Sequence, residues 1–455
     1  MQYAYQSPGP QGTLRVSRPE LLWPIHPKDS ARIVEIELLL NGEPLEARYE
    51  GGAVRATPPA PLAPGTYTVR CRVTLSPKQN DAQTTWSFTV APGAQASLPR
   101  ASPWAGDTLL AVNRLRNRLG LAPLSLDARL CAAAQAHALY LDKNQQVGHV
   151  ESARKPGFVG ETPLNRAQSY GFQGTLAEDV SLADGTAEKI ARGLFDAPYH
   201  RLPFLRPGPL LFGAGHSGRA GCLLFGGDGV PGTTVSPYDG EMGIPTTWRN
   251  DEIPSPTRFL PDAPKIVGYP IVLAHHASPG TRPALTVRSA RLTTAAGTEV
   301  RCLVNTPARD RELSYACVLL PLAPLQPNTT YQVEVIADEV TRRWRFTTGS
   351  ARETAFGPLD LRPGDLKLIG TLEKAERAKD RLTLRVVRAQ AYGTPEQALP
   401  RPVSVTLQVS KQTRFVSQAG RSGTVDLTPG LPLAVIVPNV PLNNAIPART
   451  VILLR

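Results

Sequence analysis

Two stretches far apart in the chain carry the same pattern of prolines, aromatic residues and alternating apolar residues. Residues 61–69 are PLAPGTYTV and are followed by WSFT at 86–89. Residues 324–333 are PLQPNTTYQV and are followed by WRFT at 344–347. In each copy a proline-flanked turn leads into one strand, and Trp and Phe alternate toward the core in the next. The repeat predicts two copies of one β-module whose aromatic residues form the core.

The sequence around each copy supports this interpretation. Residues 17–95 contain IVEIELLL, TYTVRCRV and TTWSFTV, separated by turn signals, and the second copy falls within residues 236–350. Short alternating runs with regular turns are typical of a β-sandwich. The pattern resembles the Ig-like modules of bacterial extracellular proteins, so we expect one Ig-like sandwich in each range. Residues 1–16 are polar and rich in Pro and Gly, and we expect them to form a disordered tail.

Residues 104–230 have a different character. In TLLAVNRLRNRLG the apolar residues recur at helical spacing. In LSLDARLCAAAQAHALYL a second helix is expected to begin after Asp127, a residue type that caps helices. Thr162, which precedes a proline, and Thr186 indicate two further helix starts. LLFGAGHS and AGCLLFGG indicate two short strands. The window therefore predicts a layered α/β or α+β unit between the two β-modules.

The C-terminal residues 358–455 return to β-structure with five alternating runs. They predict a small β-barrel, of which an OB-like barrel is one form, or a third sandwich. OB-like barrels that bind nucleic acid stack bases on exposed aromatic side chains, which are scarce here. The net charge of +12 comes mainly from arginines scattered among Asp and Glu, without a basic run. We therefore expect no nucleic-acid partner.

The five cysteines include no CxxC pair, which argues against a zinc ribbon or a thioredoxin-like site. Cys302 and Cys317 lie in EVRCLV and LSYACVLL, two runs expected to pair as a hairpin. Either a disulfide joins them in an oxidising compartment, or both are separately buried thiols.

No run reaches the roughly 18 apolar residues of a membrane span, so no transmembrane segment is predicted. The opening MQYAYQSPGP lacks the basic and apolar regions of a signal peptide. Either the protein is cytosolic, or its start was trimmed or mis-called, and the domain content favours the second.

The candidate catalytic and metal-binding residues lie in the predicted α/β unit, residues 104–230. Its imidazoles and carboxylates are His149, Glu151, Glu161, Glu178, Glu188 and His200. Two imidazoles with two carboxylates suit zinc or another divalent cation, or general acid–base work. Spacing alone does not say which of them meet. No G-x-S-x-G elbow and no phosphate-binding loop is present.

The same window resembles the bacterial branch of the CAP superfamily, also called the SCP domain. The matching text, in order, is LLAVNRLRNRLGLAPLSLDARLCAAAQAHALYL, GHVES, PGFVGETPLNRAQSYGF, AEDVS, FDAPYHRLPFL and FGAGHS. The family pattern runs Asn-x-x-Arg, Gly-Leu-x-Pro-Leu, Ala-x-x-His-Ala, a loop His, Gly-Glu-Asn, Ser-Pro-x-His-Arg and Gly-x-Gly. The resemblance covers about 125 residues. It implies an α/β/α sandwich set between the Ig-like modules.

The resemblance implies a cleft with two histidines and two acids that holds zinc or another divalent ion in some members. By position, the loop His is His149, the Gly-Glu-Asn glutamate is Glu178 and the Pro-x-His-Arg histidine is His200. Glu151 fits best as the second acid, with Glu161 and Glu188 as fallbacks.

Two departures from the family pattern matter. Gly-Glu-Asn has become Ala177-Glu178-Asp179, so that Asp179 adds a carboxylate, and Tyr199 stands where it would narrow the cleft mouth. His137, at the edge of the second helix, is expected to be a hydrogen-bonded structural residue and not a ligand.

Three functions follow as hypotheses. The first is a secreted or cell-envelope protein without enzymatic activity, whose cleft binds a lipid, glycan or protein and holds a divalent cation in one variant of the hypothesis. The second is a metal-dependent hydrolase in which Glu151 activates water. The third is a structural or adhesive envelope spacer.

Overall fold

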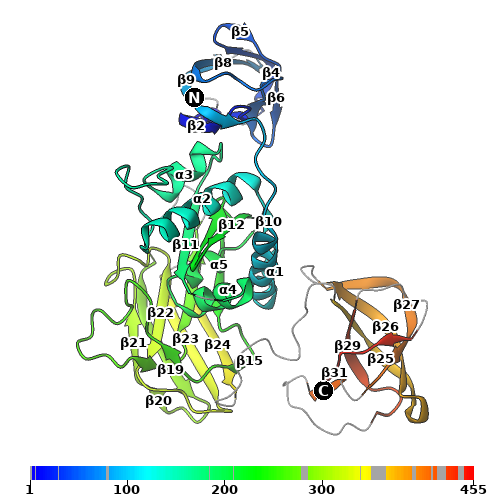
Figure 1. The fold of residues 1–455 in the computed structure, drawn as a ribbon. Helices are drawn as coiled ribbons and strands as arrows, with labels where there is room; N and C mark the ends of the chain where they lie inside the picture. The colour runs from blue at the N-terminus through cyan, green and yellow to red at the C-terminus, as the bar shows by residue number, and fades with distance from the viewer. Residues whose placement is uncertain are drawn as a thin grey trace. The chain divides into compact units, whose positions relative to one another are not determined.

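The computed structural model describes residues 3–5, 7–28, 30–77, 81–183, 185–208, 210–277, 285–338, 340–349, 365–391, 396–410, 413–417, 427–438 and 445–454 (Figure 1). The chain divides into two compact units. Unit 1 comprises Met1–Leu109, Ser125–Ile190 and Leu210–Asp228, and unit 2 comprises Leu110–Leu124, Ala191–Pro209 and Gly229–Arg455.

The first β-module, in unit 1, is a sandwich of two sheets. One sheet has the order β1 (Tyr3–Tyr5), β3 (Leu21–Pro27), β7 (Ala53–Ala56), β6 (Ala47–Glu50). The other has the order β2 (Gly12–Val16), β9 (Ala82–Gln95), β8 (Gly65–Ser76), β4 (Arg32–Leu40), β5 (Glu43–Pro44). Both sheets contribute to one apolar core that contains Trp23 and Trp86, as expected for an Ig-like sandwich.

The expectation of a disordered tail over residues 1–16 is wrong. β2 pairs in parallel with β9, and β1 pairs with β3. Leu14 and Val16 are buried in the sandwich core, two residues apart on the same face of β2. The high Pro and Gly content of the segment hid this short period-2 pattern.

The central α/β part has one mixed sheet with the order β10 (Ser125–Leu126), β12 (Leu211–Ser217), β13 (Ala220–Gly226), β11 (Leu176–Leu182). Its helices are α1 (Pro103–Arg118), α2 (Ala128–Asn144), α3 (Pro163–Ser169), α4 (Ala187–Asp196) and α5 (Arg201–Phe204). The boundary between the two units passes through α1 and α4.

Local sequence explains where these helices begin. Asp127 caps α2 by accepting hydrogen bonds from the backbone N–H groups of Arg129 and Leu130. Thr162 caps α3 in a capping box, and the side chain of Thr186 accepts from the backbone of Lys189 at the start of α4. All three predicted starts are confirmed.

Glycines on β12 and β13 bring helices close to both faces of the sheet. A Cβ on Gly215 would lie 2.2 Å from the backbone nitrogen of Gln135, so α2 contacts that face directly. On the opposite face, Gly221 lies against Trp104 of α1 and Ile190 of α4. The arrangement is the predicted α/β/α sandwich.

The second β-module lies in unit 2. One sheet has the order β14 (Gly232–Ser236), β18 (Ile271–His276), β22 (Ala316–Pro321), β21 (Cys302–Asn305). The other has the order β15 (Glu241–Ile244), β24 (Thr341–Thr348), β23 (Thr330–Ala337), β19 (Val287–Thr294), β20 (Glu299–Val300). A short antiparallel pair, β16 (Trp248–Arg249) and β17 (Ile266–Val267), contributes Trp248 and Val267 to the core of this module.

The sequence repeat forms the same cross-strand pairs in both modules. Tyr67 pairs with Phe88 in the first module, and their rings stack with centroids 5.6 Å apart. Tyr331 pairs with Phe346 in the second, at 5.5 Å. The Val and Trp positions also pair and are buried in each copy. The prediction that these aromatic residues are core is confirmed.

The C-terminal residues, also in unit 2, form one curled half-barrel sheet. Its order is β28 (Arg414–Ser417), β31 (Thr450–Leu453), β29 (Pro432–Pro438), β25 (Asp365–Glu376), β26 (Arg381–Ala391), β27 (Gln397–Gln408), β30 (Ile446–Pro447). A 3-10 turn, η1 (Arg377–Lys379), joins β25 to β26. The five runs predicted as strands correspond to β25, β26, β27, β29 and β31.

The hairpin expected around Cys302 and Cys317 exists, but the disulfide does not. β21 and β22 pair with Cys302 opposite Pro321, four residues beyond Cys317. At about 3.3 Å per residue, this register separates the two cysteines by more than a disulfide allows. Both thiols are free, and burial raises the pKa of each to about 12.

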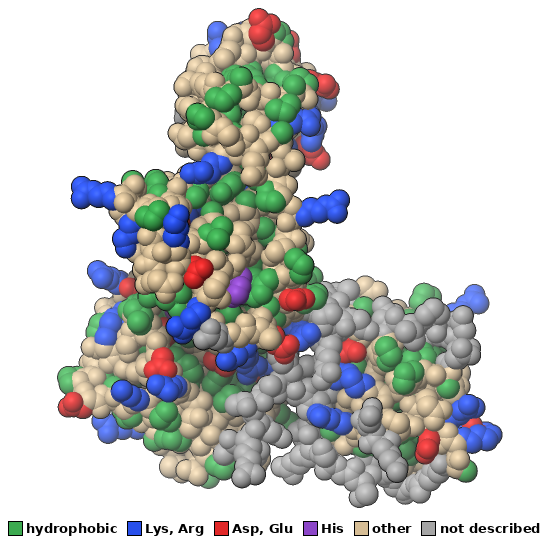
Figure 2. All heavy atoms as spheres, viewed as in Figure 1, with side chains coloured by type: hydrophobic (Ala, Val, Ile, Leu, Met, Phe, Trp, Pro, Cys, Tyr) green, Lys and Arg blue, Asp and Glu red, His purple; other side chains and the backbone are tan. Residues whose placement is uncertain are grey.

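Charged side chains of both signs are interspersed over the face drawn in Figure 2, without one continuous basic patch there.

None of the helices in the described ranges is both long enough and apolar enough to cross a membrane.

The free thiols give a direct test. We expect the denatured protein to react with five equivalents of a thiol reagent without prior reduction, and the native protein to react far more slowly because the cysteines are buried or half-buried. Quantitative titration with Ellman's reagent measures both. Three reactive thiols in the denatured protein would indicate a disulfide and contradict the register.

Candidate functional site

A cluster of ionisable side chains lies inside unit 1, and we call it the buried charge cluster. It consists of His137, Glu151, Arg166 and Glu178, each no more than 1% exposed by side chain, together with half-exposed His149. His137 comes from the middle of α2, Arg166 from α3 and Glu178 from β11. The loop between α2 and α3 supplies the other two.

Arg166 lies at the centre of the cluster. Its Nη2 donates to both carboxylate oxygens of Glu178, at 2.9 and 2.7 Å, and its Nε lies 3.6 Å from Glu151 Oε1. The remaining N–H groups donate to the carbonyls of Gly160 and Glu161, and Nη2 also reaches that of His149. A single guanidinium therefore binds both acids and the loop between α2 and α3.

His137 is the second partner of the buried acids. Its Nδ1 lies 2.8 Å from Glu151 Oε1, and its Nε2 lies 3.0 Å from the carbonyl oxygen of Gly148. Both ring nitrogens therefore face acceptors, whereas a neutral imidazole has only one N–H. The prediction of a structural, hydrogen-bonded His137 is confirmed.

Glu178 is ionised in this setting. Burial alone would raise its pKa, but the hydrogen bond from His149 and the charges of His137 and Arg166 outweigh burial and lower the pKa below its ordinary value. The Cys222 thiol donates to the same carboxylate at 3.5 Å, and burial raises the pKa of that thiol well above its usual range. The carboxylate that orients His149 is therefore ionised at neutral pH.

His149 connects the cluster to solvent. Its Nδ1 donates to Glu178 Oε1 at 3.0 Å, and its side chain is 44% exposed. Two exposed apolar residues of the same loop flank it, Val147 at 54% and Val150 at 60%. The structure brings His149 and Glu178 together as predicted.

Glu151 has a structural role in the buried charge cluster. Its Oε2 accepts from the backbone N–H of Val159 at 2.8 Å, and its Oε1 faces His137. With its side chain fully buried and both oxygens bonded, it holds the loop between α2 and α3.

The fallback acids contribute no carboxylate to the cluster. Glu161 is exposed and offers only its backbone carbonyl. Glu188 lies in the first turn of α4, where a negative side chain favours the helix dipole. Asp179 is buried on β11, one residue after Glu178 and so directed to the opposite side of the strand.

His200 and Tyr199 belong to unit 2, with partners of their own. His200 Nδ1 lies 2.7 Å from Glu252 Oε1, and the Tyr199 hydroxyl donates to Asp310. Tyr199 is thus bonded to the second β-module. No sequence signal marked Glu252, which lies outside the family pattern.

The buried charge cluster does not fit a metal ion. Divalent cations need carboxylate lone pairs, but those of Glu151 and Glu178 are directed at Arg166, His137, His149 and backbone N–H groups. A guanidinium already supplies the central positive charge. Across the described ranges, no three His, Cys, Asp or Glu side chains are arranged to hold a metal.

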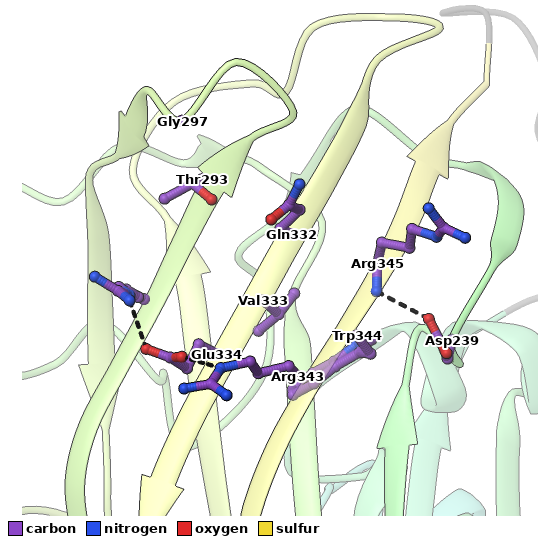
Figure 3. A pocket seen from close by; sticks show the side chains of 10 residues that line it. Asp239, Thr293, Gly297, Gln332, Val333, Glu334, Arg343, Trp344 and Arg345 are labelled. Atoms are coloured by element: carbon purple, nitrogen blue, oxygen red, sulfur yellow. Dashed lines mark hydrogen bonds and ion pairs between the residues drawn. The ribbon is translucent and has the colours of Figure 1, made fainter.

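A hollow on the second β-module is a different kind of surface. It lies over β19, β23 and β24, and Figure 3 shows Glu334 between two arginines. Arg291 pairs with Glu334 at 2.7 Å, and Arg343 bonds the same carboxylate, whose pKa these contacts lower. These arginines are 60% and 71% exposed, so the ion pairs are weak and solvated. The hollow lacks the buried polar groups that characterise a binding site.

One comparison identifies the family of part of the chain. The CAP family model, described as the cysteine-rich secretory protein family, matches residues 109–218. The chain therefore carries a CAP domain at residues 109–218. Among curated proteins, none has a significantly similar sequence.

Solved structures similar to the chain fall into two groups. An extracellular SCP-domain protein of Bacillus anthracis is 14% identical, covering 50% of this chain and 67% of its own, with a TM-score of 0.23. A cysteine-rich secretory protein of Staphylococcus aureus is 12% identical, covering 49% and 83%, with a TM-score of 0.21. The fibronectin(III)-like modules of Clostridium thermocellum CbhA are 7% identical, covering 78% and 97%, at 0.16.

Within the buried charge cluster, Arg166 is the residue that sequence reasoning missed. Arginine is a common residue on an exposed helix, and nothing in ETPLNRAQSYG marks this one as buried. The available signal was the capping box at Thr162, because it fixes the start of α3 and thereby which of its residues face inward.

Arg166→Met tests the role of this guanidinium. Removing it leaves the charges of Glu151 and Glu178 buried without their partner, so we expect a loss of about 3–5 kcal/mol in the free energy of unfolding. Urea denaturation followed by circular dichroism measures it. Arg154→Gln, in the exposed part of the neighbouring loop, is the control and should stay within about 0.5 kcal/mol. A loss of under about 1 kcal/mol in Arg166→Met would contradict the assignment.

Glu178→Gln tests the charge of the second acid. Because the folded-state pKa of Glu178 lies below its unfolded value, its stabilisation is present above about pH 4.3 and is lost as pH falls through the folded-state pKa. The variant should be less stable at pH 7 and lose stability less steeply between about pH 4.5 and 3. Urea midpoints across this range measure the slope. An unchanged slope, equal to that of the exposed-acid control Glu161→Gln, would count against the assignment.

Proposed function

We propose that this chain is a secreted or cell-envelope CAP-domain protein that binds a lipid-like amphiphile at His149 without chemical turnover. The observation that carries the proposal is the single opening of the buried charge cluster to solvent. Of its five members only His149 is exposed, and Glu178 fixes the orientation of its ring. The secretory description of the family supports the location.

His149 offers a polar contact of defined geometry. Since Nδ1 donates to Glu178, Nε2 of a neutral ring accepts hydrogen bonds, and Nε2 of a protonated ring donates them. A head group with a hydroxyl can bind the first form and an anionic head group the second. The buried cluster behind the ring limits the conformational entropy that would be lost on binding.

The apolar rim supplies the rest of the argument for an amphiphile. Val147 and Val150 are more than half exposed, on either side of His149 in the chain. Covering apolar side chains contributes about 25 cal/mol per Å² of surface removed from water. A ligand with an alkyl part beside a polar head would use both features, whereas a glycan would use mainly the imidazole.

The geometry gives no support to the hydrolase hypothesis within unit 1. That hypothesis needs Glu151 to activate water, but its side chain is fully buried and both of its oxygens are hydrogen-bonded. A general base must reach the proton that it abstracts, directly or through one water.

Calorimetric titration with dihexanoyl phosphatidylglycerol, below its micelle concentration, tests the proposal. We expect saturable binding that weakens about tenfold in His149→Ala, the loss of one hydrogen bond to a charged group. Val150→Ser should weaken binding several-fold, because a rim contact is lost. Val34→Ser is the matched control, since Val34 is 54% exposed on the first β-module, and should leave the affinity unchanged.

A chitin tetrasaccharide, titrated in parallel, separates the ligand classes. Binding of the saccharide alone, with the same dependence on His149, would correct the ligand class to a glycan. Absence of binding by both probes, in protein with an unchanged unfolding curve, would overturn the proposal and favour the structural spacer.

A further inference from the structure

Three consecutive residues of the CAP domain, Tyr199, His200 and Arg201, each bond to the second β-module within unit 2. Tyr199 and His200 lie between α4 and α5, Arg201 is the first residue of α5, and all three belong to the Pro-x-His-Arg element of the family pattern. Their partners in the second β-module come from loops and strands after residue 230, beyond the 109–218 match. The second β-module therefore shapes the surroundings of a CAP signature.

Arg201 fixes the backbone of this element. Its side chain is fully buried, Nε donates to the carbonyl of Phe195 at 2.6 Å, and Nη1 donates to the carbonyl of Pro270 at 2.8 Å. The guanidinium also lies 4.7 Å from the ring centroid of Tyr269. Because these contacts join α4 to the second module, the position of His200 is set from both sides.

Tyr199 adds a second anchor. Its hydroxyl donates to the buried carboxylate of Asp310 and accepts from Arg258 Nη1 at 2.9 Å. Asn305 Nδ2 approaches the same oxygen at 3.4 Å. Instead of narrowing a cleft mouth, the Tyr199 side chain is bonded to two loops of the second β-module.

His200 then meets one buried carboxylate. Glu252 Oε1 accepts from the backbone N–H groups of Tyr199 and His200, each at 2.9 Å, and lies 2.7 Å from His200 Nδ1. The Glu252 side chain is fully buried, whereas that of His200 is 16% exposed. Glu252 Oε2 is buried and has no hydrogen-bond partner among the described residues.

We infer that Glu252 is a positioning residue that holds His200 in the tautomer with the proton on Nδ1. The two backbone N–H groups stabilise negative charge on Oε1, and a carboxylate can only accept, so Nδ1 must donate. In the neutral ring Nε2 then carries the lone pair. The second β-module thereby determines which ring atom of the CAP histidine accepts a hydrogen bond or a proton.

This arrangement differs from simple support of a loop. A structural role for Glu252 would need only its two backbone contacts, which the chain could make with any imidazole orientation. The third contact, at the shortest of the three distances, selects one tautomer, and in an unconstrained neutral histidine that tautomer is the minor one. The inference goes beyond the proposed function and does not depend on it, because it concerns the protein without ligand.

Histidine-selective ¹⁵N labelling of the full chain tests the inference. A long-range ¹H–¹⁵N correlation spectrum at pH 8 distinguishes a protonated nitrogen from one with a lone pair, and the signal missing in His200→Gln assigns His200 among the seven histidines. We expect Nδ1 protonated and Nε2 unprotonated in the wild type. The opposite pattern in the wild type overturns the inference, whatever the variants do.

Two variants of Glu252 separate positioning from folding. Glu252→Met keeps the chain length and removes the acceptor, so His200 should revert to the tautomer protonated on Nε2. Glu252→Gln keeps one carbonyl oxygen as acceptor and should retain the wild-type pattern. Glu334→Gln, a surface acid of the same module, is the control and should change nothing. An unchanged His200 signal in folded Glu252→Met would contradict the inference.

Discussion

The site depends on one constraint, that Glu151 and Glu178 are buried within reach of the same guanidinium. Removing two carboxylates from water costs several kcal/mol per ion unless hydrogen bonds and opposite charges replace the solvent. Arg166 and His137 supply these contacts. Backbone N–H groups and His149 bind the remaining lone pairs of the two carboxylates. The cluster joins α2, α3 and β11 to the loop between α2 and α3.

Sequence reasoning predicted the parts of the fold that local chemistry determines. Asp127 and Thr162 each mark a helix start by a side-chain cap, and the Tyr67–Phe88 pair has its counterpart in the second module. It also brought His149 and Glu178 together, through the order of family motifs. These successes rest on contacts between near neighbours or on a pattern that repeats.

The remainder depends on tertiary register, which no local pattern encodes. The spacing between Cys302 and Cys317 is compatible with a hairpin in several registers. The observed register places Cys302 opposite Pro321 and not opposite Cys317, and this excludes a disulfide. Glu252 lies 52 residues after His200 and outside the motif, so no spacing rule connects them. The role of Arg166 follows from the face that α3 buries.

The flanking β-modules do more than space the CAP domain along the chain. In unit 1, Arg15 of the first module donates to the carbonyl of Phe158, in the loop that carries His149 and Glu151. In unit 2, the second module provides Glu252 to His200. Each module thus contacts a segment that holds one of the two predicted site histidines, and the CAP family pattern contains neither partner.

The central claim is that internal pairing, and not a metal ion, satisfies the acids of the buried charge cluster. Anomalous scattering at the zinc edge, from crystals grown with zinc, tests it most directly. The account predicts no peak within about 2.0–2.2 Å of Glu151 or Glu178 and an Arg166 side chain in place. A zinc peak bonded to Glu178 and His149, with Arg166 displaced, would contradict it.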